Sequence, residues 1–247
     1  MLHKTRGIAL HTVKYSETSI ISKIYTEQFG LQSYIIKGIR KQHSKIRPGL
    51  FQPLTLLELT VYHKARGSLH TIKELHNYRP YQTITTDILK SSVALFINEL
   101  VYKSVKEEEA NPELFDFLTG TCIKLDETEE SLMLIPLLFT IRLSRYLGII
   151  PHVDESPLMT FFNLQEGVFQ ATNPIGQEFL EPPLSFHFKD LLLTKQKLLH
   201  LFQTGLQAHP AVKVRNELLD RMLFYYSIHL PDFREIHAHR VLHSVLA

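Results

Sequence analysis

The chain has 247 residues, of which 44% are hydrophobic and 21% are charged, and its formal net charge is +2. This composition excludes a disordered polar chain and is sufficient for one large domain or two ordinary ones. The single cysteine, Cys122, excludes an internal disulfide framework and favours a reducing compartment, so we expect a cytoplasmic protein.

The small net charge hides a difference between the two parts of the chain. Residues 1–80 carry 13 Lys and Arg against 4 Asp and Glu, a formal charge of +9. The other 167 residues carry 14 against 21, a formal charge of −7. This split predicts that the first part binds a polyanion and that the second part packs and recruits partners.

Residues 1–80 are predicted to form strands. The runs rich in β-branched and aromatic residues are 8–13, 18–26, 31–39, 52–62 and 68–75. Turns are expected at 27–30 and 64–67, each of which ends in glycine. Because closure removes exposed sheet edges, five short antiparallel strands favour a small barrel of the OB or SH3-like type.

Residues 81–247 are predicted to be mainly helical. Helices are expected from near residue 87, from 112, over 131–148, and over 189–206, 212–229 and 233–245. A stretch with several prolines, about 151–185, interrupts this pattern, and a hairpin is expected at 161–169 around Gly167. The sequence therefore predicts an α+β protein with a barrel domain over 1–80 and a helical domain over 81–247 that contains an irregular insertion.

The most basic segment follows the third predicted strand. It places five permanent positive charges within 11 residues: Lys37, Arg40, Lys41, Lys45 and Arg47. A loop of this kind would contact phosphates with salt-dependent affinity that depends little on sequence. The alternative is a solvated loop that only keeps the barrel soluble, and the +9 charge of residues 1–80 favours nucleic acid.

Aromatic residues alternate with these charges along residues 1–80. They are Tyr15, Tyr25, Phe29, Tyr34, Phe51 and Tyr62. Binding of single strands uses aromatic rings in a basic groove, but most aromatic residues of a small barrel belong to its core. We expect one or two of the six to face a ligand.

Sequence patterns of enzymes are missing from the chain. It has neither a phosphate-binding loop, nor a G-x-S-x-G segment, nor an H-E-x-x-H segment. His237, His239 and His243 suggest a metal hydrolase as an alternative, but no carboxylate or cysteine is fixed beside them by spacing. We expect no enzyme activity, no cofactor and no bound metal.

Several blocks together resemble one family. Residues 7–11 (GIALH), 15–19 (YSETS), 25–31 (YTEQFGL), 37–41 (KGIRK) and 50–54 (LFQPL) are similar in order and spacing to the N-terminus of the bacterial RecO family. Residues 143–151 (LSRYLGIIP) resemble the helix that leads into the insertion of that family, and residues 233–246 resemble its last helix.

The resemblance implies an OB-fold barrel followed by a mainly α-helical domain. It also implies a non-enzymatic mediator of recombinational repair that binds single- and double-stranded DNA and anneals complementary strands. Such a protein works with RecR to load RecA onto DNA coated by single-strand binding protein, in the cytoplasm and at the nucleoid. An RNA-binding or ribosome-associated OB-fold adaptor remains the alternative.

Site residues follow from the same resemblance. The expected DNA-binding residues are Lys37, Arg40, Lys41, Lys45 and Arg47, followed by Arg66 and Lys73. The family's groove for the acidic tail of single-strand binding protein lies in the helical domain, and the two cations near the matching helix are Arg142 and Arg145.

One departure from the family concerns zinc. Many members have four cysteines in the insertion, whereas residues 152–183 contain none here. We therefore expect no zinc, and an insertion stabilised by apolar contacts of Phe161, Phe162, Leu164, Val168 and Phe169.

Overall fold

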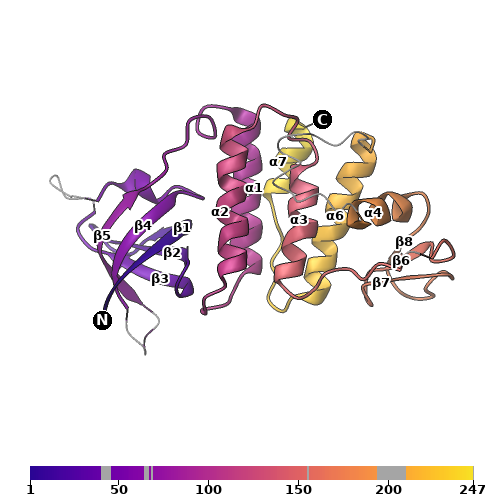
Figure 1. Cartoon of the computed structure of the whole chain (residues 1–247), viewed down its shortest axis with the longest axis horizontal. Helices are drawn as coiled ribbons and strands as arrows, with labels where there is room; N and C mark the ends of the chain where they lie inside the picture. The colour runs from indigo at the N-terminus through magenta and orange to yellow at the C-terminus, as the bar shows by residue number, and fades with distance from the viewer. Residues whose placement is uncertain (40–45, 64–66, 68, 155, 194–209, 247) are drawn as a thin grey trace. The chain divides into compact units, whose positions relative to one another are not determined.

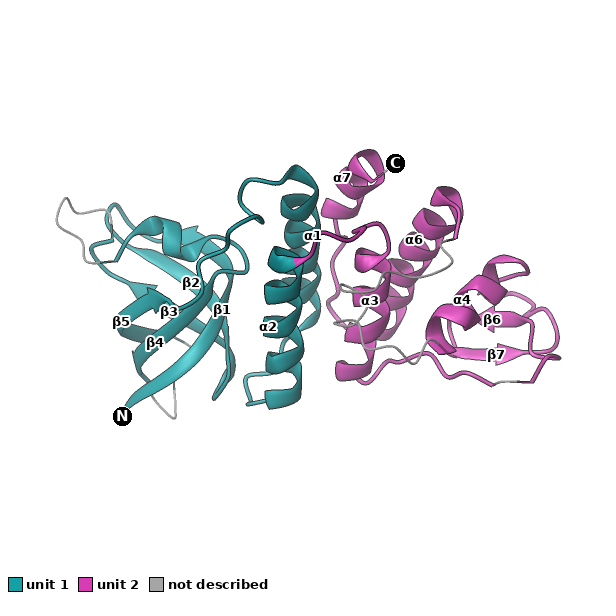
Figure 2. Cartoon of the chain, turned by 45° about the horizontal axis from the view of Figure 1, so that its top comes forward, with its two compact units in different colours: residues 1–127 teal, residues 128–247 magenta. Residues whose placement is uncertain are grey.

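The computed structural model describes residues 1–39, 46–63, 67, 69–154, 156–193 and 210–246 (Figure 1). The chain forms two compact units, residues 1–127 and 128–247, which are coloured separately in Figure 2. The first unit contains the barrel strands and the first two helices, so the domain boundary at residue 80 stays a prediction. No helix in the described ranges is long and apolar enough to cross a bilayer.

The first unit begins with a closed five-stranded barrel. Its strands are β1 (Leu2–Lys14), β2 (Ile20–Thr26), β3 (Gly30–Ile36), β4 (Leu56–Tyr62) and β5 (His70–Asn77). They are paired in the order β1-β2-β3-β5-β4, and β4 pairs again with β1. This confirms the predicted OB-fold barrel. A short 3-10 helix, η1 (Pro48–Phe51), lies between β3 and β4.

Strand β1 is much longer than the predicted segment 8–13. Its first half pairs with β4, from Leu2 opposite Tyr62 to Ile8 opposite Leu56. Its second half pairs with β2 as far as Lys14, and a register shift lies between Ala9 and His11. A strand that pairs with one neighbour along its first half and with another along its second half must be long. The polar residues at the start of β1 do not resemble a strand, so the sequence predicted only its later part.

The barrel core follows the alternation of the strands. Its buried residues include Ala9, Ile20, Ile24, Tyr34, Ile36, Leu57, Leu59, Val61 and Ile72. The turn from β2 to β3 requires glycine, because Gly30 has a φ of 61° and an added Cβ would lie 2.3 Å from the carbonyl oxygen of Glu109. The segment after α1 therefore passes directly over this turn.

Two helices complete the first unit, α1 (Ile88–Ser104) and α2 (Pro112–Glu127). Both begin where the sequence predicts. The Asp87 carboxylate accepts the Lys90 N–H at 2.9 Å, and the Asn111 amide oxygen accepts the Leu114 N–H at 3.0 Å.

The chain between the barrel and α1 is fastened to the end of α2 by Asp126. Its carboxylate accepts the backbone N–H groups of Gln82, Thr83 and Ile84 at 2.8–3.0 Å. Burial alone would raise the pKa of Asp126, but these donors lower it below its usual value. The ionised carboxylate is thus a structural acceptor.

The second unit consists of four described helices and a small sheet. The helices are α3 (Ile135–Tyr146), α4 (Leu184–Leu193), α6 (Val212–His229) and α7 (Ala238–Val245). The sheet has the order β7-β6-β8, with β6 (Phe161–Asn163), β7 (Val168–Gln170) and β8 (Phe179–Leu180). Helix α3 packs on α6, where the Tyr226 hydroxyl donates to the carbonyl oxygen of Thr140 at 2.8 Å.

Three predicted helix starts are wrong by four or five residues. Helix α3 begins at 135 rather than 131, since a turn precedes Pro136. Helix α4 begins at 184 rather than 189, directly after Pro183. Helix α7 begins at 238 rather than 233, and Phe233 instead packs against Tyr226, with ring centroids 5.5 Å apart.

The insertion is built around Phe162. Its ring centroid lies 4.9 Å from both Phe169 and Phe188, and 6.0 Å from Tyr225 of α6. Leu164 is also buried, and its carbonyl oxygen lies 2.8 Å from Nε2 of His229. The predicted apolar contacts are confirmed, since Phe162, Leu164 and Phe169 are buried and Phe161 and Val168 partly buried.

Candidate nucleic-acid interface

The structure describes three of the seven predicted DNA-binding residues. Lys37 directly follows β3 and is exposed, Arg47 precedes η1 and is exposed, and Lys73 is exposed on β5. Lys73 lies 3.7 Å from Glu74, but an exposed pair of this kind contributes about 0–1 kcal/mol and leaves the ammonium accessible. The other four, Arg40, Lys41, Lys45 and Arg66, lie outside the described residues.

Arg6 is a basic residue of the barrel that serves structure. Its guanidinium forms a two-pronged pair with Glu27, with nitrogen–oxygen distances of 2.9 and 2.6 Å, and its Cζ lies 5.2 Å from the ring centroid of Phe115. The hydrogen bond between the two side chains raises the pKa of Arg6 and lowers the pKa of Glu27. Arg6 therefore ties the barrel to α2.

Other cations of the first unit are available to a ligand. Within the described ranges, no ion pair involves Lys4, Lys23, Lys37 or Arg47. Lys23 lies in the middle of β2, which places it on the three-stranded face made by β1, β2 and β3.

Cross-strand register shows what else lies on that face. Residues directly opposite one another point to the same side of a sheet, and alternate positions of one strand share a side. The face therefore carries three rows, which are Ile8–Tyr25–Leu31, His11–Lys23–Ser33 and Val13–Ile21–Ile35.

Helices cover one half of this face. The first row is fully buried, and the Tyr25 ring stacks on Phe115 of α2 at 6.3 Å. At the end of that half, the Asn98 amide of α1 donates to the carbonyl oxygen of Leu10 at 3.0 Å.

The other half of the face is open. None of the six residues of its two rows is buried, although Val13, Ile21 and Ile35 are apolar. In OB folds, the face of the second and third strands and the neighbouring loops bind oligonucleotides. The open half combines an ammonium that has no ion-pair partner among the described residues, an imidazole and apolar side chains, a composition suited to phosphates and bases.

Two of the six predicted aromatic residues are exposed. Tyr15 follows β1 and is 60% exposed, and Tyr62 ends β4 and is 47% exposed. Tyr25, Tyr34 and Phe51 are buried, and Phe29 packs against the barrel core.

Sequence reasoning missed a stack of rings at one end of the barrel. The His63 ring stacks on Phe29 at 4.0 Å and on His70 at 4.3 Å, and His3 meets Phe29 edge-on at 5.3 Å. Burial, followed by the charges of His3 and the N-terminus, lowers the pKa of His63. These rings come from four separate segments, so no local pattern predicts the stack.

The predicted partner-binding residues lie on α3. Arg142 is partly buried and Arg145 is exposed, one turn further along the same helix. Burial lowers the pKa of Arg142, and the charge of Arg145 lowers it further.

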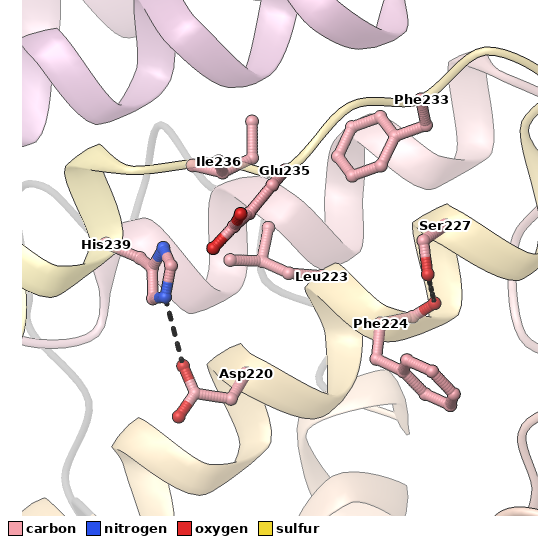
Figure 3. Close-up of a pocket in the computed structure, with 8 residues that line it drawn as sticks. All are labelled: Asp220, Leu223, Phe224, Ser227, Phe233, Glu235, Ile236 and His239. Atoms are coloured by element: carbon pink, nitrogen blue, oxygen red, sulfur yellow. Dashed lines mark hydrogen bonds and ion pairs between the residues drawn. The ribbon is translucent and has the colours of Figure 1, made fainter.

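The second unit also contains a hollow of about 310 Å³ between α6 and the segment leading into α7. Figure 3 shows Leu223 and Ile236 lining it, with the carboxylates of Asp220 and Glu235 on the same side as His239. Two carboxylates make this hollow unsuitable for a phosphate backbone.

The C-terminal histidines lie beside the same hollow. The Nε2 atoms of His239 and His243 are 4.0 and 3.4 Å from an oxygen of Asp220. Burial lowers the pKa of His239 in spite of Asp220. In the parts of the chain that the structure describes, no group of three or more His, Cys, Asp or Glu is placed to hold a metal ion.

Comparison with known proteins agrees with this architecture. Residues 1–81 match the family described as recombination protein O N terminal, and residues 85–161 match recombination protein O C terminal. A protein of Phocaeicola vulgatus is 34% identical over 94% of both chains, one of Bacteroides fragilis 33% over 94%, and one of Flavobacterium johnsoniae 35% over 94%. Each of the three is named DNA repair protein RecO. With an OB-fold barrel, matches to both family models and such relatives along nearly its whole length, the chain belongs to the RecO family.

Proposed function

We propose that this protein is a non-enzymatic, DNA-binding mediator of recombinational repair. The main support is the open half of the OB-fold face in a chain of the RecO family, where Lys23 forms no ion pair with any described residue. In this proposal the barrel binds the phosphates of single- and double-stranded DNA, and the sequence segment 37–47 contributes five further positive charges.

The proposed mechanism is annealing by charge neutralisation and alignment. Two complementary strands repel each other, and a basic surface that binds each backbone lowers that repulsion. Because these contacts are made to the phosphates and not to the base edges, the base edges remain available for pairing. We further propose that the protein works with RecR to load RecA onto DNA covered by single-strand binding protein, in the cytoplasm at the nucleoid.

The test is fluorescence-anisotropy binding of labelled single-stranded and duplex DNA at two salt concentrations. Lys41→Glu/Lys45→Glu should weaken binding to all sequences and flatten the log–log salt dependence by about 0.7 per lost contact on single strands and about 0.9 on duplex. A matched control is Lys213→Glu/Arg234→Glu, two exposed cations of the second unit with the same change in charge. An unchanged slope in the first variant would place the DNA elsewhere.

The same assay separates DNA from RNA as ligand. A strong preference for structured RNA over DNA, or failure to anneal complementary DNA strands, would contradict the repair role and support an RNA-binding adaptor. Intact labelled DNA after prolonged incubation with magnesium is the expected result for a non-enzymatic protein.

Partner binding is a separate proposal. We propose that Arg142 and Arg145 attract the acidic tail of single-strand binding protein. Arg145→Glu should weaken binding of a tail peptide without changing DNA affinity, and unchanged peptide binding would remove this helix from the interface.

A further inference from the structure

A pair of stacked rings lies at the border between the covered and open halves of the barrel face. The His11 imidazole of β1 and the Tyr102 ring of α1 have centroids 4.5 Å apart and planes 22° apart. The ammonium of Lys106 lies over the same Tyr102 ring, 5.8 Å from its centroid. Tyr102 is thus fixed by two neighbours and supports His11 from the helix side.

The His11 ring remains accessible. The residue is exposed, and Tyr102 is its only ring partner among the described residues. The second face of the imidazole therefore meets no other ring of the described residues. Lys23 is directly opposite His11 in the strand register and forms no ion pair within the described ranges.

We propose that the open face of His11 is a stacking platform for one unpaired DNA base, with Tyr102 as a positioning residue and Lys23 as the contact for a neighbouring phosphate. Single strands are bound by aromatic rings within a positively charged groove, and every base offers a π-face to such a ring. This inference rests on the proposed DNA binding and adds the part of the site that distinguishes single strands from duplex.

The distinction follows from access to the base. In a duplex the faces of the bases are stacked on their neighbours, so His11 can contact only an unpaired or unstacked base. Phosphate-binding residues serve both forms equally. Loss of the His11 ring should therefore weaken single-strand binding and leave duplex binding nearly unchanged.

The experiment compares four full-length proteins: wild type, His11→Ala, His11→Phe and His76→Ala. His76 is the control, because it is also an exposed barrel histidine but lies on β5 against Glu58. Each is titrated into a labelled thymidine oligonucleotide, into an oligonucleotide of equal length with abasic sites, and into duplex DNA. Thermal unfolding of each variant confirms that it is folded.

The expected result is a loss of roughly 5-fold or more for His11→Ala on the thymidine strand, the range for one stacked base. The same variant should bind the abasic strand and the duplex like wild type, and His11→Phe should recover thymidine binding because it keeps a ring. Equal losses on all three ligands, or no recovery by His11→Phe, would overturn the platform.

The outcome for the proposed function is read separately. If wild type binds all three ligands and His11→Ala does so equally well, the platform is wrong and DNA binding stands. If wild type binds none of them, the proposed function itself fails.

Discussion

The two halves of one sheet face differ in what covers them. Rows from the same three strands point to the same side, but the row with Tyr25 is buried under α1 and α2, whereas the row with Ile21 is open. In the first half, apolar side chains are explained by packing. In the second, the apolar side chains of Ile21 and Ile35 are only partly buried among the described residues, and we propose that a ligand contacts them.

The largest expected effect is a loss of stability when packing in the covered half of the face is removed. Phe115 is fully buried and stacks on Tyr25, so Phe115→Ala should lower the free energy of unfolding of the first unit by about 3–5 kcal/mol. Ile35→Ala in the open half should cost about 1 kcal/mol or less. Urea unfolding measures both, and equal losses would mean that the two halves are packed alike.

The next largest expected effect is a loss of stability when the hydrogen bonds between Asp126 and the segment that joins the barrel to α1 are removed. Asp126→Ala leaves three backbone N–H groups without their acceptor and should cost about 3 kcal/mol. Asp116→Ala, which removes an exposed carboxylate of the same helix, is the control.

Acid should reproduce this loss. Because the folded pKa of Asp126 is below its unfolded value of 3.8, its contribution is present above that pH and is lost as the pH falls through the folded pKa. Similar acid dependence of wild type and Asp126→Ala would contradict this assignment.

A smaller effect tests the open half directly. Lys23→Glu should weaken DNA binding severalfold and flatten the salt dependence by about 0.7 on single strands, with unchanged stability. Lys4→Glu makes the same change on β1, where Lys4 faces Thr60 of β4. Equal losses from the two variants would point to general attraction rather than contact at this face.

The smallest effect concerns the ring stack at the end of the barrel. The folded pKa of His63 is below the ordinary 6.5, so the unfolded chain binds the proton more readily. Stability from this residue is complete above about pH 6.5 and declines as the pH falls below it. His63→Phe keeps the ring and should make the melting temperature less dependent on pH between 7 and 5.

Local patterns in the sequence predicted much of the fold. The presence of five strands, the starts of α1 and α2 and the bounds of α6 follow from neighbouring residues. The candidate site was harder to predict from the sequence, because His11 of β1 and Tyr102 of α1 are far apart along the chain and meet only in the folded structure. Which basic residues are already paired, such as Arg6 with Glu27, also depends on tertiary contacts that charge counting does not reveal.

The closure of the barrel has a kinetic consequence. Among the described residues, two pairs join β3 and β5 in parallel, Tyr34 with His70 and Ile35 with Thr71. Each antiparallel pair of neighbouring strands is matched over six or seven positions. A seam this short should open before the rest of the unit in local unfolding. Amide hydrogens along this seam should therefore exchange with solvent earliest in the barrel. A DNA strand bound against Ile35 would slow that exchange.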